Sequence, residues 1–143
     1  MTEKNYYDIP RTEKLLIADK DSLLAFFFAH QEPLLEQLYK QGIFTTPGIY
    51  KSLVKQLSTA DLKMLRRFVH ESRYHASRAA VTKIMEETKI LTASEAFAVL
   101  CARDKHMDIL LDDPRKIPVI ESYSVHGIRP SDIVLAAAMT EKR

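Results

Sequence analysis

The feature that most constrains the fold is a pair of short, uninterrupted apolar runs, each followed at once by acidic residues. The first run covers residues 15–18 (LLIA) and precedes Asp19, and the second covers residues 109–111 (ILL) and precedes Asp112 and Asp113. Apolar runs of this length without polar alternation are typical of strands that are buried on both faces. Such strands form parallel sheets with helices on both sides. The two runs therefore predict an α/β fold.

The remaining segments alternate between strand and helix patterns. Residues 43–46 and 125–128 are further strand candidates, and the strand at the second apolar run is expected over residues 108–111. In the first half of the chain, helices are expected over residues 22–30 and 32–41, with Gly42 ending the second, and from Thr46-Pro47 onward. A long helical stretch is expected from Ser58 to about residue 89, with a break near 72–75. Further helices are expected over 92–105, in a short stretch after 114, and from residue 130. Because residues 58–105 supply no strand, helix should dominate.

Length and composition limit the classes of protein. The 143 residues, 46% of them hydrophobic, are enough for one compact domain, which we place at 14–143 after a polar N-terminal arm at 1–13. Cys101 is the only cysteine, so the chain can form neither an internal disulfide nor a Cys-based metal site. We therefore expect a cytoplasmic protein. The formal charge of +2 neither requires nor excludes a nucleic-acid partner.

Carboxylates follow the two apolar runs. In an open parallel sheet, ligands bind outside the carboxyl ends of the strands, and this edge would gather Asp19, Asp21, Asp112 and Asp113. Neighbouring carboxylates repel unless a cation lies between them, and oxygen ligands suit Mg²⁺ or Mn²⁺. A structural explanation competes, because Asp before a helix is a common N-cap and Glu95 is the N3 residue of a capping box that begins at Thr92.

The order of these landmarks resembles the PIN-domain family, which consists of metal-dependent ribonucleases and includes many toxin–antitoxin nucleases. The resemblance covers most of residues 14–138. The matching segments are LLIAD at 15–19 with Leu23 after it, IFTTP at 43–47, SEAFA at 94–98, ILLDD at 109–113, and the hydrophobic tail at 125–138.

The resemblance implies a three-layer fold with a short parallel sheet, and an activity in which a divalent metal ion helps to hydrolyse RNA phosphodiester bonds. Asp19, Glu95 and Asp113 would be catalytic metal ligands, with Asp112 as a further ligand and Asp21 and Thr46 as additional site residues. It also implies RNA as a partner and raises an antitoxin-like protein as a further partner. A homodimer is a separate expectation, because the run FFF at residues 26–28 suggests core and dimer packing. The chain departs from the family in residues 51–55, where an acidic residue is usual and this sequence has Lys51, Ser52 and Lys55.

Two other functions fit parts of the sequence. Asp19 and Asp21 are also similar to the Asp-x-Asp opening of haloacid-dehalogenase-type phosphatases, in which the first Asp attacks phosphorus. The Gly-Thr that usually follows is absent here. The missing carboxylate near residues 51–55 favours instead a non-catalytic PIN-like module that binds RNA or a protein. Basic residues between 63 and 78 could contact phosphates, although such a run is more often the solvated face of a helix.

Overall fold

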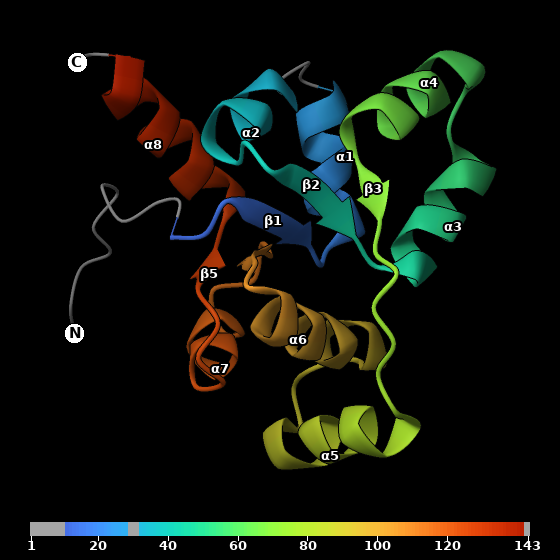
Figure 1. The fold of residues 1–143 in the computed structure, drawn as a ribbon, viewed down its shortest axis with the longest axis vertical. Coiled ribbons are helices and arrows are strands. Elements are labelled where there is room, and N and C mark those ends of the chain that lie inside the picture. The colour runs from blue at the N-terminus through green and yellow to red at the C-terminus, as the bar shows by residue number, and fades with distance from the viewer. Residues whose placement is uncertain (1–10, 29–31, 142–143) are drawn as a thin grey trace.

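The computed structural model describes residues 11–28 and 32–141 (Figure 1). Strands and helices alternate along the chain. The strands are β1 (Lys14–Ile17), β2 (Gly42–Thr45), β3 (His70–Glu71), β4 (Asp108–Leu110) and β5 (Gly127–Ile128). The helices are α1 (Lys20–Phe28), α2 (Glu32–Leu38), α3 (Pro47–Gln56), α4 (Thr59–Phe68), α5 (Arg78–Thr88), α6 (Ala93–Lys105), α7 (Ile117–Glu121) and α8 (Pro130–Glu141). In the described residues, no helix is long and apolar enough to cross a membrane.

The strands form one parallel sheet in the order β3-β2-β1-β4-β5. β1 is central, and its last residue, Ile17, pairs with Thr45 of β2 on one side and with Leu110 of β4 on the other. The chain continues outward from β1 in one direction through β2 and β3, and in the other through β4 and β5. The gap between β1 and β4 is therefore the point at which the strand order reverses.

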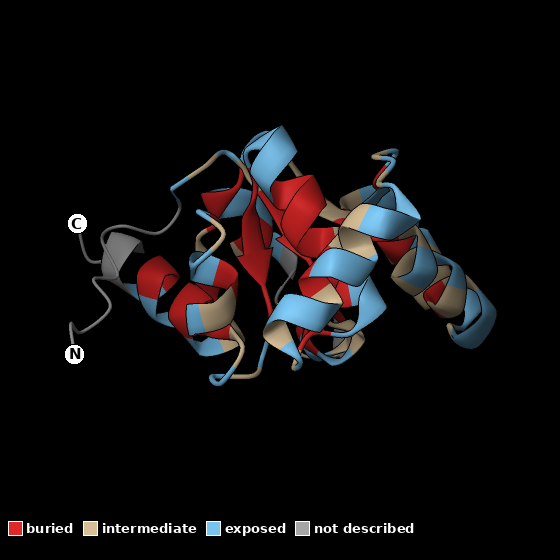
Figure 2. Cartoon of the chain, turned by 90° about the horizontal axis from the view of Figure 1, so that it is seen from below, coloured by how far each residue is buried: buried red, intermediate tan, exposed pale blue. Residues whose placement is uncertain are grey.

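Helices cover both faces of the sheet. Leu15 and Ile17 of β1 pack into a core with α1, α2, α3, α4 and α8, whereas Leu16 and Ala18 pack into a second core with α5, α6 and α7. Successive residues of a strand point to opposite faces, so a continuous apolar run supplies both cores. Figure 2 shows the buried strands between helices whose outer faces are exposed. The predicted three-layer, helix-rich α/β fold is confirmed.

Three helix starts follow the signals in the sequence. The side chains of Thr46, Ser58 and Thr92 each accept a hydrogen bond from a backbone N–H in the first turn, of α3, α4 and α6 respectively. The capping box at Thr92 is complete, because the Glu95 carboxylate accepts the Thr92 N–H in return. These N-caps satisfy N–H groups that have no partner within the helix.

Several predicted boundaries were wrong. Residues 58–105 do contain a strand, the two-residue β3, which pairs with Phe44 and Thr45 at the edge of the sheet. The break expected near residues 72–75 is present but is wider, because α4 ends at Phe68 and α5 begins at Arg78. Gly42 does not cap α2, which ends at Leu38, but opens β2 with a φ of 130°. Residues 1–10 of the expected arm and the expected helix end at residue 30 lie outside the described residues.

Candidate functional site at the carboxyl edge of the sheet

The strand register brings together polar residues from separate parts of the sequence. Because Ile17 pairs with both Thr45 and Leu110, the residues that follow β1, β2 and β4 meet at one edge. We define the carboxyl-edge site as Asp19, Thr46, Glu95, Asp112 and Asp113. It adjoins the gap between β1 and β4, where the order reverses and where open α/β sheets bind their ligands.

Asp19 links the start of α1 to the segment after β4. One carboxylate oxygen, Oδ1, accepts the Asp21 N–H at 3.0 Å. The other, Oδ2, accepts the Ser22 hydroxyl at 3.2 Å and the Asp112 N–H at 3.4 Å. Asp19 therefore has the N-terminal role at α1 that a structural explanation predicts, and it also contacts the second acidic segment. Asp21 is exposed and contacts Asp19 through its backbone.

Glu95 is buried and ion-paired. Its side chain is held by the Thr92 N–H at 2.8 Å, and both of its carboxylate oxygens accept a hydrogen bond from Lys116 Nζ at 2.9 Å. The Lys116 and Glu95 side chains are only 16% and 10% exposed. An ammonium group thus occupies the position next to Glu95 at which the family resemblance implies a metal ion. The capping-box role predicted for Glu95 is confirmed, whereas its role as a metal ligand stays a prediction.

Asp112 and Asp113 are each paired with an arginine. Asp112 is exposed, and its Oδ1 accepts hydrogen bonds from Arg129 Nε at 3.2 Å and Nη2 at 3.1 Å. Asp113 contacts Arg115 through both oxygens, at 3.3 Å to Nε and 3.2 Å to Nη2. The hydrogen bonds from Arg115 hold the pKa of Asp113 below its ordinary value. The two carboxylates are therefore neutralised from the side of α7 and β5.

Thr46 and Ser94 add hydroxyl groups to the same edge. Thr46 is 2% exposed, caps α3 by accepting the Ile49 N–H, and lies 3.5 Å from the Ser94 hydroxyl at the start of α6. This contact places the N-termini of α3 and α6 side by side, with their unpaired N–H groups near one edge of the sheet. Helix α3, which includes residues 51–55, contains no acidic residue, in agreement with the departure from the family pattern there.

The metal ion that the resemblance implies can be tested against these contacts. The donor chemistry fits, because carboxylate oxygens are the ligands that Mg²⁺ and Mn²⁺ prefer. The grouping is incomplete, since within residues 11–28 and 32–141 no three His, Cys, Asp or Glu side chains are arranged to hold a metal ion. Glu95, Asp112 and Asp113 are instead each paired with a basic side chain. A metal ion would therefore have to replace Lys116 at Glu95.

Sequence reasoning missed four residues at this edge, namely Ser94, Arg115, Lys116 and Arg129. Arg129 could have been found, because it directly follows β5 and so lies at the same carboxyl edge as Asp112. Lys116 carries no comparable signal, because it precedes the short helix α7 and makes no side-chain cap there. Its position opposite Glu95 depends on how α7 packs beside α6, which no local pattern specifies.

Comparison with known proteins agrees with the class that this fold defines, a three-layer α/β domain built on a short parallel sheet. The structure is similar to a PilT N-terminus domain protein from the hyperthermophilic archaeon Sulfolobus solfataricus. The TM-score is 0.57 at 12% sequence identity, and the match covers 87% of this chain and 92% of that one. The PilT N-terminus domain is the PIN domain, so the predicted PIN-like fold is confirmed. The sequence matches no protein-family model and no curated protein.

Proposed function

We propose that this protein hydrolyses RNA phosphodiester bonds at the carboxyl-edge site with the help of a divalent metal ion. The observation that carries the proposal is the contact between Asp19 Oδ2 and the Asp112 N–H at 3.4 Å, which joins two acidic segments 93 positions apart. This contact lies at the switch point of a PIN-like sheet, where ligands of open α/β sheets bind. Asp19, Glu95 and Asp113 are the proposed metal ligands, with Asp112 beside them.

When bound, a Mg²⁺ or Mn²⁺ ion supplies a Lewis acid that polarises the phosphodiester and makes water a better nucleophile. The chain's own side chains would contribute binding and orientation. Asp19 is held in place by N–H and hydroxyl donors on both of its oxygens, so its carboxylate is preorganised. Arg129, Arg115 and Lys116 are paired with the carboxylates of this edge. If these carboxylates hold a metal ion instead, the three cations would be released to attract a phosphate and stabilise the charge that develops on it.

The test is cleavage of a labelled single-stranded RNA in Mn²⁺ or Mg²⁺, repeated with EDTA. We expect cleavage with metal and none with EDTA, and a loss of about a hundredfold or more in rate for Asp19→Asn, because a misplaced or missing charge-stabilising group typically costs that much. Glu86→Gln is the matched control, since Glu86 is an exposed carboxylate of α5 and does not belong to the carboxyl-edge site. Cleavage that survives EDTA, or equal rates for Asp19→Asn and the control, would rule the proposal out.

A non-catalytic PIN-like module that binds RNA is the second candidate function. The specific observation in its favour is that Lys116 occupies both oxygens of Glu95. This function predicts that wild-type protein retains RNA in EDTA and never cleaves it in metal. The phosphatase reading of Asp19 and Asp21 is less well supported, because the similar solved structure has a PIN fold.

A protein partner or a homodimer would need an apolar surface. Among the described residues, Val134 and Leu135 of α8 are large hydrophobic side chains that remain 48% and 44% exposed. This pair is where we place the contact with an antitoxin-like partner or a second copy. Sedimentation velocity of the wild-type protein and of Leu135→Glu measures whether a second copy binds at this surface. A sedimentation coefficient that is the same for the two proteins would exclude this surface from a homodimer.

A further inference from the structure

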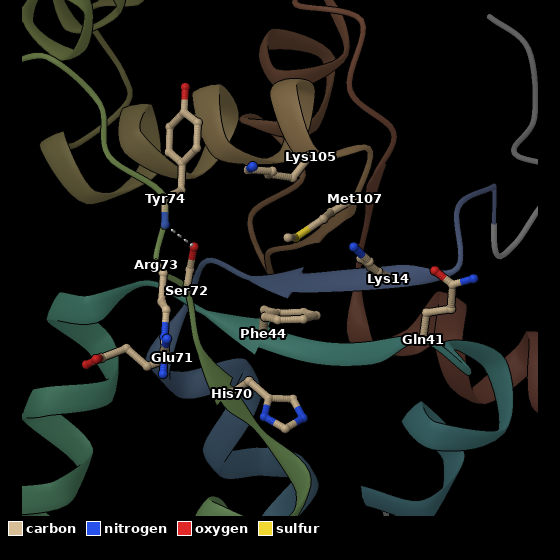
Figure 3. Close-up of a pocket in the computed structure, with 10 residues that line it drawn as sticks. All are labelled: Lys14, Gln41, Phe44, His70, Glu71, Ser72, Arg73, Tyr74, Lys105 and Met107. Carbon is tan, nitrogen blue, oxygen red and sulfur yellow. Dashed lines mark hydrogen bonds between the residues drawn. The ribbon is translucent and has the colours of Figure 1, made fainter.

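A second concave region lies on the open part of the sheet, beside α6. Its volume is about 640 Å³, and we call it the β2–β3 groove. The basic and aromatic side chains that line it are Lys14, Phe44, His70, Arg73, Tyr74 and Lys105. Figure 3 shows the Phe44 ring at its centre, with Lys14 and His70 on either side and Lys105 and Met107 toward α6. None of these residues belongs to the carboxyl-edge site.

The groove is positively charged. Lys14, Arg73 and Lys105 line it, against a single acidic lining residue, Glu71. Arg73 and Lys105 are exposed and Lys14 is half-buried. In the described part of the chain, none of the three cations forms an ion pair. Their charges are therefore available to an anionic ligand, and they lie around the groove rather than along one helix face.

The groove also presents aromatic rings. The Phe44 and His70 rings have centroids 5.4 Å apart at an interplanar angle of 43°. Phe44 is only partly buried, because α6 covers the centre of the sheet and leaves β2 and β3 open on this face. Aromatic rings beside cations are the combination that single-stranded nucleic acids use, since unstacked bases pack on the rings while phosphates contact the charges. A duplex, whose bases are already stacked, would not use the rings.

The groove leads toward the carboxyl-edge site. The Ser72 N–H donates to the carbonyl of Thr45, the last residue of β2, at 2.9 Å, and Thr46 of the carboxyl-edge site follows Thr45 directly. The Ser72 hydroxyl in turn accepts the Tyr74 N–H at 3.2 Å and lies 3.3 Å from Cys101 Sγ of α6. These contacts fix the segment that forms one end of the groove. A single-stranded nucleic acid bound in the groove would therefore continue to the edge where Asp19 lies.

From the charge, the rings and this continuity, we infer that the β2–β3 groove binds single-stranded RNA, with phosphates at Lys14, Arg73 and Lys105 and a base against Phe44 and His70. The choice of RNA rests on the proposed function, but binding does not depend on catalysis. The groove would hold the strand outside the carboxyl-edge site and so position the phosphodiester that is cleaved.

The experiment measures binding of a fluorescent oligouridylate by anisotropy, in EDTA so that no cleavage occurs, over a range of salt concentrations. The triple variant Lys14→Gln, Arg73→Gln, Lys105→Gln removes the groove charges. The matched triple Lys55→Gln, Lys63→Gln, Arg66→Gln removes three exposed charges from α3 and α4 on the other face of the sheet. We expect the groove triple to flatten the slope of log affinity against log salt by about 2, at roughly 0.7 per lost phosphate contact, and the control triple to leave it close to the wild-type slope.

Two further variants complete the test. One changes only exposed side chains, so that misfolding cannot explain its effect, and the other removes the aromatic ring of Phe44. Arg73→Gln with Lys105→Gln changes only exposed side chains and should flatten the slope in the same direction as the triple. Phe44→Leu should weaken binding about tenfold with an unchanged salt slope, because it removes stacking and no charge. Circular dichroism confirms that each variant is folded.

The outcomes separate this inference from the proposed function. If the groove triple loses binding while the wild-type protein does not cleave RNA in Mn²⁺, the groove assignment stands and the nuclease proposal falls. If wild type cleaves RNA but the two triples bind oligouridylate equally well, the groove assignment is overturned and the nuclease proposal stands. A wild-type protein with no measurable affinity for oligouridylate also overturns the groove assignment.

Discussion

At the scale of single residues, the chemistry of the carboxyl edge depends on which cation each carboxylate faces. Lys116 and Glu95 are largely removed from solvent, and Glu95 has one further donor, the Thr92 N–H. Breaking a buried ion pair by removing one partner leaves the other charge without compensation. Lys116 therefore stabilises the fold and, on the proposed function, competes with a metal ion for Glu95.

Replacing this lysine separates the two roles. We expect Lys116→Gln to lower the free energy of unfolding by about 1–3 kcal/mol in EDTA, because a buried charged group loses its partner. Millimolar Mn²⁺ should restore more stability to the variant than it adds to wild type, since Glu95 is then open to the ion. Urea denaturation measures both effects, with Lys63→Gln on the exposed side of α4 as the control. Equal stabilisation of the variant and wild type by Mn²⁺ would show that Lys116 does not compete.

Tyr74 gives a residue-scale prediction for pH. Its hydrogen bond to Asp104 raises the pKa of Tyr74 to about 12 from 10.0, and the same bond lowers the pKa of Asp104. Because the folded-state pKa of the tyrosine is raised, the contribution of this bond to stability is complete below pH 10 as long as Asp104 is ionised, and it is lost as the pH rises through about 12. Tyrosinate absorbance of wild type minus Tyr74→Phe measures the pKa, which should fall toward 10 in Asp104→Asn. A Tyr74 that already ionises near pH 10 in wild type contradicts the bond.

At the scale of elements, the helix starts could be predicted and the pairings between elements could not. Thr46, Ser58 and Thr92 are local signals, because an N-cap satisfies N–H groups of its own helix. β3 escaped prediction because it has two residues, both exposed, and exists only through its pairing with β2. The break between α4 and α5 was expected near residues 72–75, but the strand within it was not.

A buried hydrogen bond joins Tyr39, the residue that follows α2, to Asp108 of β4. The Tyr39 hydroxyl donates to Asp108 Oδ2 at 2.8 Å, and both residues are almost fully buried. Burial, with Asp108 next, raises the pKa of Tyr39 far above its ordinary value, so the phenol stays protonated and remains a donor. The other Asp108 oxygen, Oδ1, has no hydrogen-bond partner among the described residues.

We therefore expect Tyr39→Phe to cost about 1–3 kcal/mol of unfolding free energy, because it removes a donor from a buried carboxylate. Tyr50→Phe is the matched control in α3. Tyr50 is partly exposed, so its change should be within about 0.5 kcal/mol. Urea denaturation compares the two variants. If they lose the same stability, the Tyr39–Asp108 bond contributes nothing measurable.

At the scale of the whole molecule, the sequence predicted the layers and the edge, but not the ionic state of that edge. Continuous apolar runs require a sheet with two covered faces, and parallel strands place Asp19 and Asp112 at the same edge. The pairing of Glu95 with Lys116, and of Asp112 with Arg129, arises from the packing of α7 and β5 against the rest of the sheet. Local sequence patterns do not specify contacts between distant elements. A cluster of carboxylates without basic partners was therefore expected, whereas three of them form ion pairs.

The central claim is that Asp19, Glu95 and Asp113 form one cation-binding edge. Paramagnetic broadening of backbone amide signals by sub-stoichiometric Mn²⁺ tests it most directly, because the effect falls off steeply with distance from the ion. The account predicts selective loss of the signals of Asp19, Glu95, Asp112 and Asp113, which Asp19→Asn abolishes and Glu86→Gln preserves. Uniform broadening, or broadening centred on another part of the molecule, would contradict it.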